Sequence, residues 1–139
     1  MRPQIMAHRT GAGTYPPNSW EGIYRSALEG IQVVECDITF VNGVPFVWTD
    51  TDNSLLEKPI KSITNLSPDE VSSIKRRDTG GYLFTFTQII SLLNSIPHHQ
   101  VKIYLDVKYY DSDWAEEFLP IPQHFIDLVI EKIIDHNKE

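Results

Sequence analysis

One stretch of sequence decides the fold: Ile31-Gln32-Val33-Val34-Glu35-Cys36-Asp37-Ile38-Thr39-Phe40. Its many β-branched residues favour a strand, so we predict a strand over residues 31–40. Successive side chains of a strand point to opposite faces, which puts Glu35 and Asp37 on one face and Cys36 on the other. We expect Cys36 to be a buried small residue rather than a nucleophile. The Asn42-Gly43 pair that follows favours a two-residue hairpin turn.

Strands and amphipathic helices alternate on both sides of this stretch. Strands are predicted at residues 4–8 and 101–108, and helices at about 19–29, 67–75, from 85 onward and 122–136. The first helix has Asn18 and Glu21 as a capping pair, and Gly30 ends it. Such alternation predicts a parallel sheet built with right-handed crossovers. The sequence therefore indicates an α/β fold.

Two further interpretations concern residues near these helices. Trp20 and Tyr24 recur at helical spacing with the apolar positions of the first helix, so we expect both in the core. The basic run of Lys75, Arg76 and Arg77 is interpreted as a solvated helix end rather than as a binding site for an anionic partner.

Composition narrows the class of protein. The chain has 139 residues, with 12 Lys and Arg against 19 Asp and Glu, and the formal net charge of −7 argues against a nucleic-acid partner. A hydrophobic content of 41% supports one core, and we expect a single domain over residues 1–139.

Two features of the sequence predict a cytoplasmic location. The chain has a single cysteine, and its N-terminus lacks the apolar segment of a signal peptide. No apolar run reaches the roughly 18 to 20 residues of a membrane span.

Polar residues stand at the ends of the predicted strands. His8 follows the first, Glu35 and Asp37 lie on the second, and Asp106 and Lys108 end the third. In an α/β barrel the carboxyl ends of the strands meet at one mouth, where the active site lies. We therefore expect these side chains to converge. The alternative interpretation is that the carboxylates of Glu35 and Asp37 only face solvent, on the exposed side of an edge strand.

The order of these motifs resembles the glycerophosphodiester phosphodiesterase family. The family pattern runs His-Arg-Gly, Pro-Glu-Asn-Thr, Glu-x-Asp, a hairpin ending in His-Asp, and Glu-x-Lys on a later strand. The corresponding segments are Ala7-His8-Arg9-Thr10, Pro16-Pro17-Asn18-Ser19, Glu35-Cys36-Asp37, Trp48-Thr49-Asp50 and Asp106-Val107-Lys108. The match covers about residues 5 to 108.

The resemblance implies a TIM-type barrel of the phospholipase C-like kind and hydrolysis of a small phosphodiester in lipid metabolism. It makes His8 a catalytic acid or base and gives Arg9 and Lys108 roles in binding the phosphate. It also implies a divalent metal, Mg²⁺ or Ca²⁺, held by carboxylates. In this chain the metal ligands would be Glu35, Asp37 and Asp106.

Three residues depart from the family pattern. Pro17 stands in place of a metal-binding Glu, Thr49 in place of the second His, and Asp106 in place of a Glu. Aspartate keeps an oxygen ligand, and water can complete the coordination shell. Threonine cannot exchange a proton near neutral pH as imidazole does, and loss of one member of an acid/base pair costs roughly 10²- to 10⁴-fold in rate.

Length leads to a further expectation. A complete barrel has eight strands and about 250 residues, whereas only three central strands are predicted here, so we expect roughly the first half of a barrel with a β-hairpin insertion. Unpaired strand edges would make the chain a segment of a longer protein, a natural truncation, or one half of an oligomer. Two functions stay open: a metal-dependent phosphodiesterase, and a non-catalytic binding or scaffold module that keeps the fold.

Overall fold

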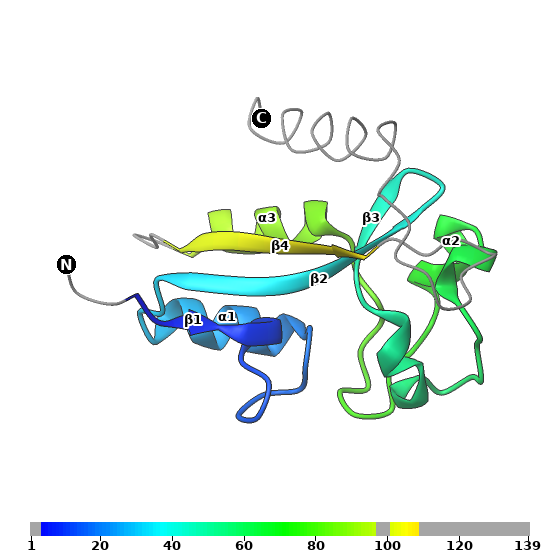
Figure 1. Ribbon diagram of the computed structural model, residues 1–139, viewed down its shortest axis with the longest axis horizontal. Helices are drawn as coiled ribbons and strands as arrows, with labels where there is room; N and C mark the ends of the chain where they lie inside the picture. Colours follow the sequence, from blue (N-terminus) through cyan, green and yellow to red (C-terminus); the bar gives the residue numbers. More distant parts are fainter. Residues whose placement is uncertain (1–3, 97–100, 109–139) are drawn as a thin grey trace, which may run out of the picture. The chain divides into compact units, whose positions relative to one another are not determined.

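The computed structural model describes residues 4–96 and 101–108. Its sheet has four strands, labelled in Figure 1: β1 (Met6–Ala7), β2 (Val33–Val41), β3 (Val44–Val47) and β4 (Lys102–Lys108). β2 is central, with β1 and β4 parallel to it and β3 antiparallel. The predicted α/β fold with a parallel sheet and a hairpin is confirmed. The first strand is shorter than predicted, because the chain turns into a 3-10 turn at His8–Thr10.

Within the described residues, three α-helices accompany the sheet: α1 (Trp20–Leu28), α2 (Pro68–Ser72) and α3 (Phe86–Asn94). Capping boxes open two of them, Ser67 with Glu70 at α2 and Thr85 with Gln88 at α3. These boxes supply acceptors for backbone N–H groups that lack partners within the helix. α2 ends three residues earlier than predicted. The helix predicted over residues 122–136 lies outside the described residues.

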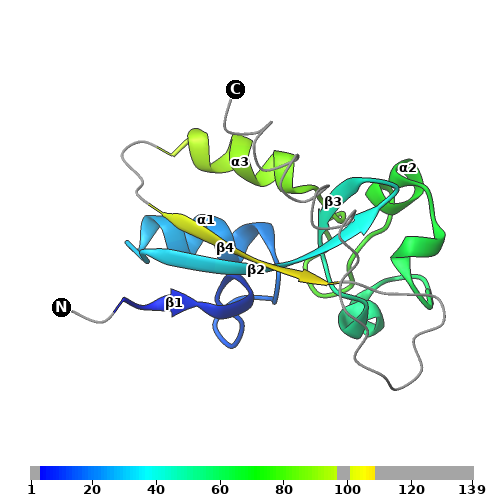
Figure 2. The same cartoon turned by 45° about the horizontal axis from the view of Figure 1, so that its top comes forward.

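Two apolar clusters lie on either side of the hairpin. In the first, α1 and α3 pack against one face of the sheet, as Figure 2 shows from a second angle. Its members include Ile23 and Ala27 of α1, Val34, Cys36 and Ile38 of β2, and Ile89 and Leu93 of α3. The second lies under the segments that follow the hairpin and includes Phe46, Trp48, Ile63 and Val71. α1 and α3 thus cover the Cys36 face of the sheet, whereas Val71 of α2 belongs to the second cluster.

The two faces of the central strand β2 carry different residues, with Cys36 on the covered face and the acidic residues on the opposite one. Cys36 is fully buried, and burial, together with the charges of Glu35 and Asp37, raises the pKa of its thiol. This confirms the expectation that Cys36 is a packing residue, because a thiol with a raised pKa gives little thiolate. Glu35 and Asp37 stand on the other face, together with Asp106 of β4.

The prediction that Trp20 and Tyr24 belong to the core is wrong. Their exposed fractions are 41% and 40%, and Leu28, four residues on, is also exposed. These residues form one stripe along α1, whereas Ile23 and Ala27 face the sheet. The apolar surface of α1 is therefore wider than the part of it that is buried against the described sheet. None of the helices in the described parts of the chain has the length and apolar character to cross a membrane.

Candidate functional site

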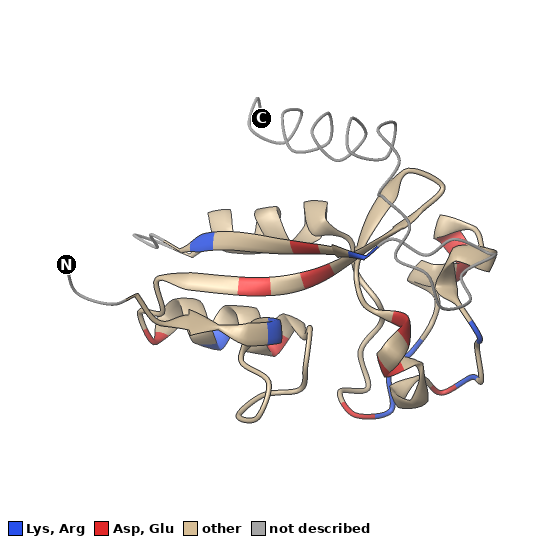
Figure 3. Cartoon of the chain, viewed as in Figure 1, with Lys and Arg blue, Asp and Glu red and all other residues tan. Residues whose placement is uncertain are grey.

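An acidic triad of Glu35, Asp37 and Asp106 lies where β2 and β4 run side by side. The alternation of side chains puts the first two on one face, and the register of the parallel strands sets Asp106 opposite Asp37. One oxygen from each carboxylate lies within 4.8 Å of the others, and Figure 3 shows these acidic positions in red on the two strands. Three hard oxygen donors at this spacing fit Mg²⁺ or Ca²⁺.

Lys108 neutralises one side of the triad. Its Nζ atom lies 2.6 Å from Oδ2 of Asp106 and 3.2 Å from Oδ1 of Asp37. Partial burial acts to lower the pKa of Lys108, but the hydrogen bond to Asp106 and the charge of Asp37 outweigh it and raise the pKa. The lysine is therefore a firmly charged partner of the two carboxylates.

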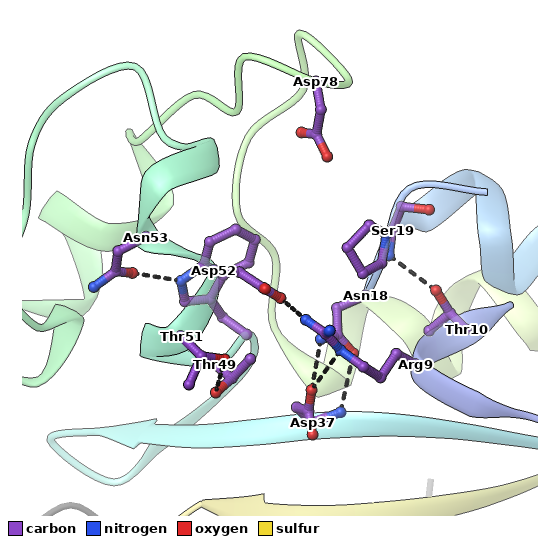
Figure 4. Close-up of polar contacts among 12 residues, drawn as sticks. Arg9, Thr10, Asn18, Ser19, Asp37, Thr49, Thr51, Asp52, Asn53 and Asp78 are labelled. Carbon is purple, nitrogen blue, oxygen red and sulfur yellow. Dashed lines mark hydrogen bonds and ion pairs between the residues drawn. The ribbon is translucent and has the colours of Figure 1, made fainter. Parts of the chain in front are cut away.

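Arg9 contacts the other side. Its backbone N–H donates to Oε2 of Glu35 at 2.6 Å, and its Nε atom lies 3.3 Å from Oδ2 of Asp37. Nη2 donates to Asp52, a contact drawn in Figure 4. Partial burial acts to lower the pKa of Arg9, yet the hydrogen bond and charge of Asp52, with those of Asp37, raise it. Arg9 holds an uncommon backbone conformation, φ 47°, in the turn after β1.

His8 stands at the rim of the site. Its Nε2 atom lies 3.8 Å from Oε2 of Glu35, and its side chain is 72% exposed. The imidazole therefore lies between solvent and the buried carboxylate of Glu35. The predicted convergence of His8, Arg9, Glu35, Asp37 and Asp106 is confirmed in the geometry.

Asn18 supports Asp37 in a way that the capping prediction missed. Its Nδ2 donates to Oδ2 of Asp37 at 2.8 Å, and its Oδ1 accepts from the Asp37 backbone N–H at 3.0 Å. The cap of α1 is Ser19, whose hydroxyl accepts from Gly22. Asn18 has φ 49° and is fully buried, and its amide is used by the site instead of by the helix.

Arg76 overturns the interpretation of the basic run as a solvated helix end, because only 1% of this residue is exposed. Arg76 lies beyond the end of α2, and its guanidinium carbon lies 5.0 Å from the centroid of the Trp48 ring. It donates to the carbonyls of Pro17 and Asn18 at 2.8 and 2.9 Å, and to both oxygens of Asp78. Arg76 therefore holds in place the loop from which Asn18 reaches Asp37.

Pro17 and Thr49, two of the three positions that depart from the family pattern, each make a contact within the protein. Thr49 is 2% exposed, and its Oγ1 lies 3.2 Å from that of Thr51. The carbonyl of Pro17 is an acceptor for Arg76, so this position has a structural use. Asp52, at the other end of the Arg9 side chain, carried no signal in the sequence, because it lies in a polar stretch without a recognisable period.

Comparison with known proteins gives matches among structures only. No protein-family model matches the sequence, and no curated protein sequence matches it. A glycerophosphoryl diester phosphodiesterase structure from Agrobacterium tumefaciens C58 matches with a TM-score of 0.76 at 19% identity, over 96% of this chain and 51% of that one.

Two other structures agree. The glycerophosphoryl diester phosphodiesterase domain of a Mycobacterium tuberculosis protein matches with a TM-score of 0.72 at 15% identity, over 98% of this chain and 49% of that one. A phosphodiesterase from Oleispira antarctica, solved with the product sn-glycerol-3-phosphate, matches with a TM-score of 0.69 at 16% identity, over 99% and 52%. The chain spans about half the length of these structures, and it has the fold of half a glycerophosphodiester phosphodiesterase barrel.

Proposed function

We propose that this chain carries the metal and phosphate site of a metal-dependent phosphodiester hydrolase of the glycerophosphodiester phosphodiesterase type. The observation that carries the proposal is the convergence of Glu35, Asp37 and Asp106, whose oxygens lie within 4.8 Å of one another. Such a cluster of carboxylates is costly to bring together unless cations balance it. Two cationic side chains, Arg9 and Lys108, stand beside it.

Each residue has a role that its position supports. When bound by the three carboxylates, a divalent metal supplies positive charge that stabilises the phosphoryl oxygens. Arg9 and Lys108 offer N–H donors to the non-bridging oxygens of a phosphodiester. His8, at the exposed rim, transfers a proton. The product held by the Oleispira antarctica enzyme, sn-glycerol-3-phosphate, supports a glycerophosphodiester as the substrate class.

A second candidate is a module that binds the same ligand without hydrolysing it. It is favoured by Thr49, a buried hydroxyl at the position where the family pattern has its second histidine. A hydroxyl does not titrate near neutral pH, so one half of the acid/base pair is missing. The two candidates share the metal and phosphate contacts and differ only in turnover.

Turnover and metal binding together test the proposal. Metal binding is measured by calorimetry, and release of the alcohol from a glycerophosphodiester is measured with Mg²⁺, with Ca²⁺ and with chelator. Metal-dependent hydrolysis that His8→Ala abolishes would establish the enzyme. Binding of the metal and of the glycerophosphodiester without hydrolysis would establish the binding module. Absence of metal binding to the wild-type chain would refute both.

A further inference from the structure

Two of the guanidinium nitrogens of Arg9, Nε and Nη2, already lie beside protein carboxylates. Its Nε lies 3.3 Å from Oδ2 of Asp37, and its Nη2 is paired with Oδ2 of Asp52. The side chain of Arg9 is 26% exposed and that of Asp52 13% exposed, so the pair is shielded from solvent. Figure 4 shows the guanidinium between the two carboxylates. A phosphate oxygen that reached Nη2 would have to displace Asp52.

The backbone around Asp52 is firmly anchored. Asp52 lies in the 3-10 turn Asp50–Leu55, and its N–H donates to the carbonyl of Thr49 at 3.0 Å. The next residue, Asn53, accepts from Nε1 of the buried Trp48 at 2.8 Å. It also donates to the carbonyls of Ile60 and Lys61 at 3.2 and 3.1 Å. The backbone of Asp52 is therefore fixed beside Arg9, and the contact opens by rotation of one of the two side chains.

The balance of charge adds a second obstacle to an anion. Four carboxylates, those of the acidic triad and Asp52, face the two cationic side chains of Arg9 and Lys108. The described cluster therefore has a formal excess of two negative charges. In such a partly buried site a phosphate is repelled, whereas a divalent cation balances the excess.

We propose that Asp52 is a specificity-determining residue, whose carboxylate competes with a phosphate group for Arg9. The inference rests on the proposed function, in which Arg9 is a phosphate ligand. Asp52 takes the place of the anion at the guanidinium until a divalent cation has reduced the negative potential of the site. Phosphate esters should therefore bind weakly to the metal-free chain, and the divalent cation should bind before the phosphate ester.

The test uses the full chain and sn-glycerol-3-phosphate as the probe, with calorimetry in chelator and in excess Mg²⁺. Asp52→Asn removes the competing charge while it keeps the shape of the side chain, and Asp52→Ser is a second neutral variant if the first folds poorly. Asp52→Glu keeps the charge. Asp69→Asn is the matched control, because it removes one carboxylate from an exposed position at the start of α2, away from Arg9.

In chelator, Asp52→Asn should bind the probe at least about tenfold more tightly than the wild type, as expected when a charge-assisted hydrogen bond no longer competes. Asp52→Glu and Asp69→Asn should stay within about twofold of the wild type. Mg²⁺ should tighten binding to the wild type more than to Asp52→Asn.

Equal affinities of Asp52→Asn and the wild type, or an equal gain in Asp69→Asn, would overturn the role of Asp52. Failure of either neutral variant to bind the probe would also overturn it. None of these outcomes would contradict the proposed metal and phosphate site of the wild type. Conversely, a gain in Asp52→Asn with no metal binding in the wild type would remove the proposed metal site and keep the competition at Arg9.

Discussion

Gly22 of α1 lies directly against the backbone carbonyl of Thr10. A Cβ atom at Gly22 would come within 2.3 Å of that oxygen and 2.7 Å of the Thr10 hydroxyl. The same hydroxyl accepts from the N–H of Ser19 at 3.0 Å. The first turn of α1 is thus docked on the turn that carries His8 and Arg9, and the absence of a side chain at Gly22 makes this approach feasible.

Gly22→Ala is therefore expected to destabilise the protein, although this change stabilises an ordinary helix by about 1 kcal/mol. The new methyl group collides with a backbone oxygen that cannot rotate away, and overpacking of this kind costs about 1 to 3 kcal/mol. Urea unfolding measures the loss. Gly81→Ala is the matched control, because its nearest contact would be the Thr79 hydroxyl at 3.4 Å, and it should change stability by less than about 0.5 kcal/mol. Equal effects would show that the contact with Thr10 is not restrictive.

Divalent metal should raise the melting temperature of the wild-type chain. A ligand present at about 100 times its dissociation constant stabilises the native state by about 2.7 kcal/mol, and metal binding also relieves repulsion within the acidic triad. Asp106→Asn should lose most of the shift, and the 47% exposure of the Asp106 side chain makes this variant well tolerated. Asp69→Asn should keep the full shift. A wild-type melting temperature that does not move with millimolar Mg²⁺ or Ca²⁺ would contradict the metal site.

Arg76→Met should cost about 3 kcal/mol or more of the free energy of unfolding. The variant leaves the carbonyls of Pro17 and Asn18 without their donor and the partly buried Asp78 without its partner. Loss of the hydrogen bonds of a buried charged group is strongly destabilising. The neighbouring Arg77 is exposed, so Arg77→Met should cost less than about 1 kcal/mol. Denaturant unfolding of both variants checks the contrast, and similar losses would argue against a special role for Arg76.

The pair of Arg76 and Asp78 should also make stability depend on pH. Partial burial acts to raise the pKa of Asp78, but the hydrogen bond and charge of Arg76 outweigh it and lower the pKa. A carboxyl whose pKa is lower in the folded state stabilises the fold above its unfolded pKa of about 3.9. This contribution is lost as the pH falls through the folded value.

Asp78→Asn should accordingly be less stable than the wild type near neutral pH, and the difference should shrink below about pH 4. Urea unfolding of both proteins over a series of pH values measures the difference. Asp69→Asn, which removes an exposed carboxylate, should show a smaller dependence on pH. A difference between Asp78→Asn and the wild type that stays constant down to acid pH would exclude the ion pair as its cause.

Turnover of glycerophosphodiesters by the unmodified chain should be low or absent, because Thr49 supplies no titrating group. Thr49→His should increase the rate only if the metal site is intact and the barrel is completed, and the combination with Pro17→Glu should increase it more than either change alone. The buried position of Thr49 means that the imidazole costs about 1 to 3 kcal/mol of stability. Robust metal-dependent turnover by the unmodified chain, abolished by His8→Ala, would show that one histidine is enough.

Local patterns predicted much of the fold and the residues of the site. The hairpin at Asn42-Gly43 forms as predicted, with φ of 46° and 78°, because few residues other than Gly and Asn tolerate positive φ. Both capping boxes open helices for an equally local reason. The burial of Arg76 escaped prediction, since three basic residues in a row are usually solvated and its partners Pro17 and Asn18 are more than fifty residues away.

The sequence by itself determined that Glu35 and Asp37 share one face of a strand and that Cys36 turns to the other, because the alternation of side chains along a strand is a local property. Only the tertiary structure decided that Asp106 stands opposite Asp37 and that Asp52 reaches Arg9. The register between parallel strands depends on a long crossover and on packing against α1 and α3, and a shift of one residue would turn Asp106 away from the site. The residue types of the site could therefore be predicted from the sequence. The balance of charge at the site depends on contacts between segments that are distant in the sequence.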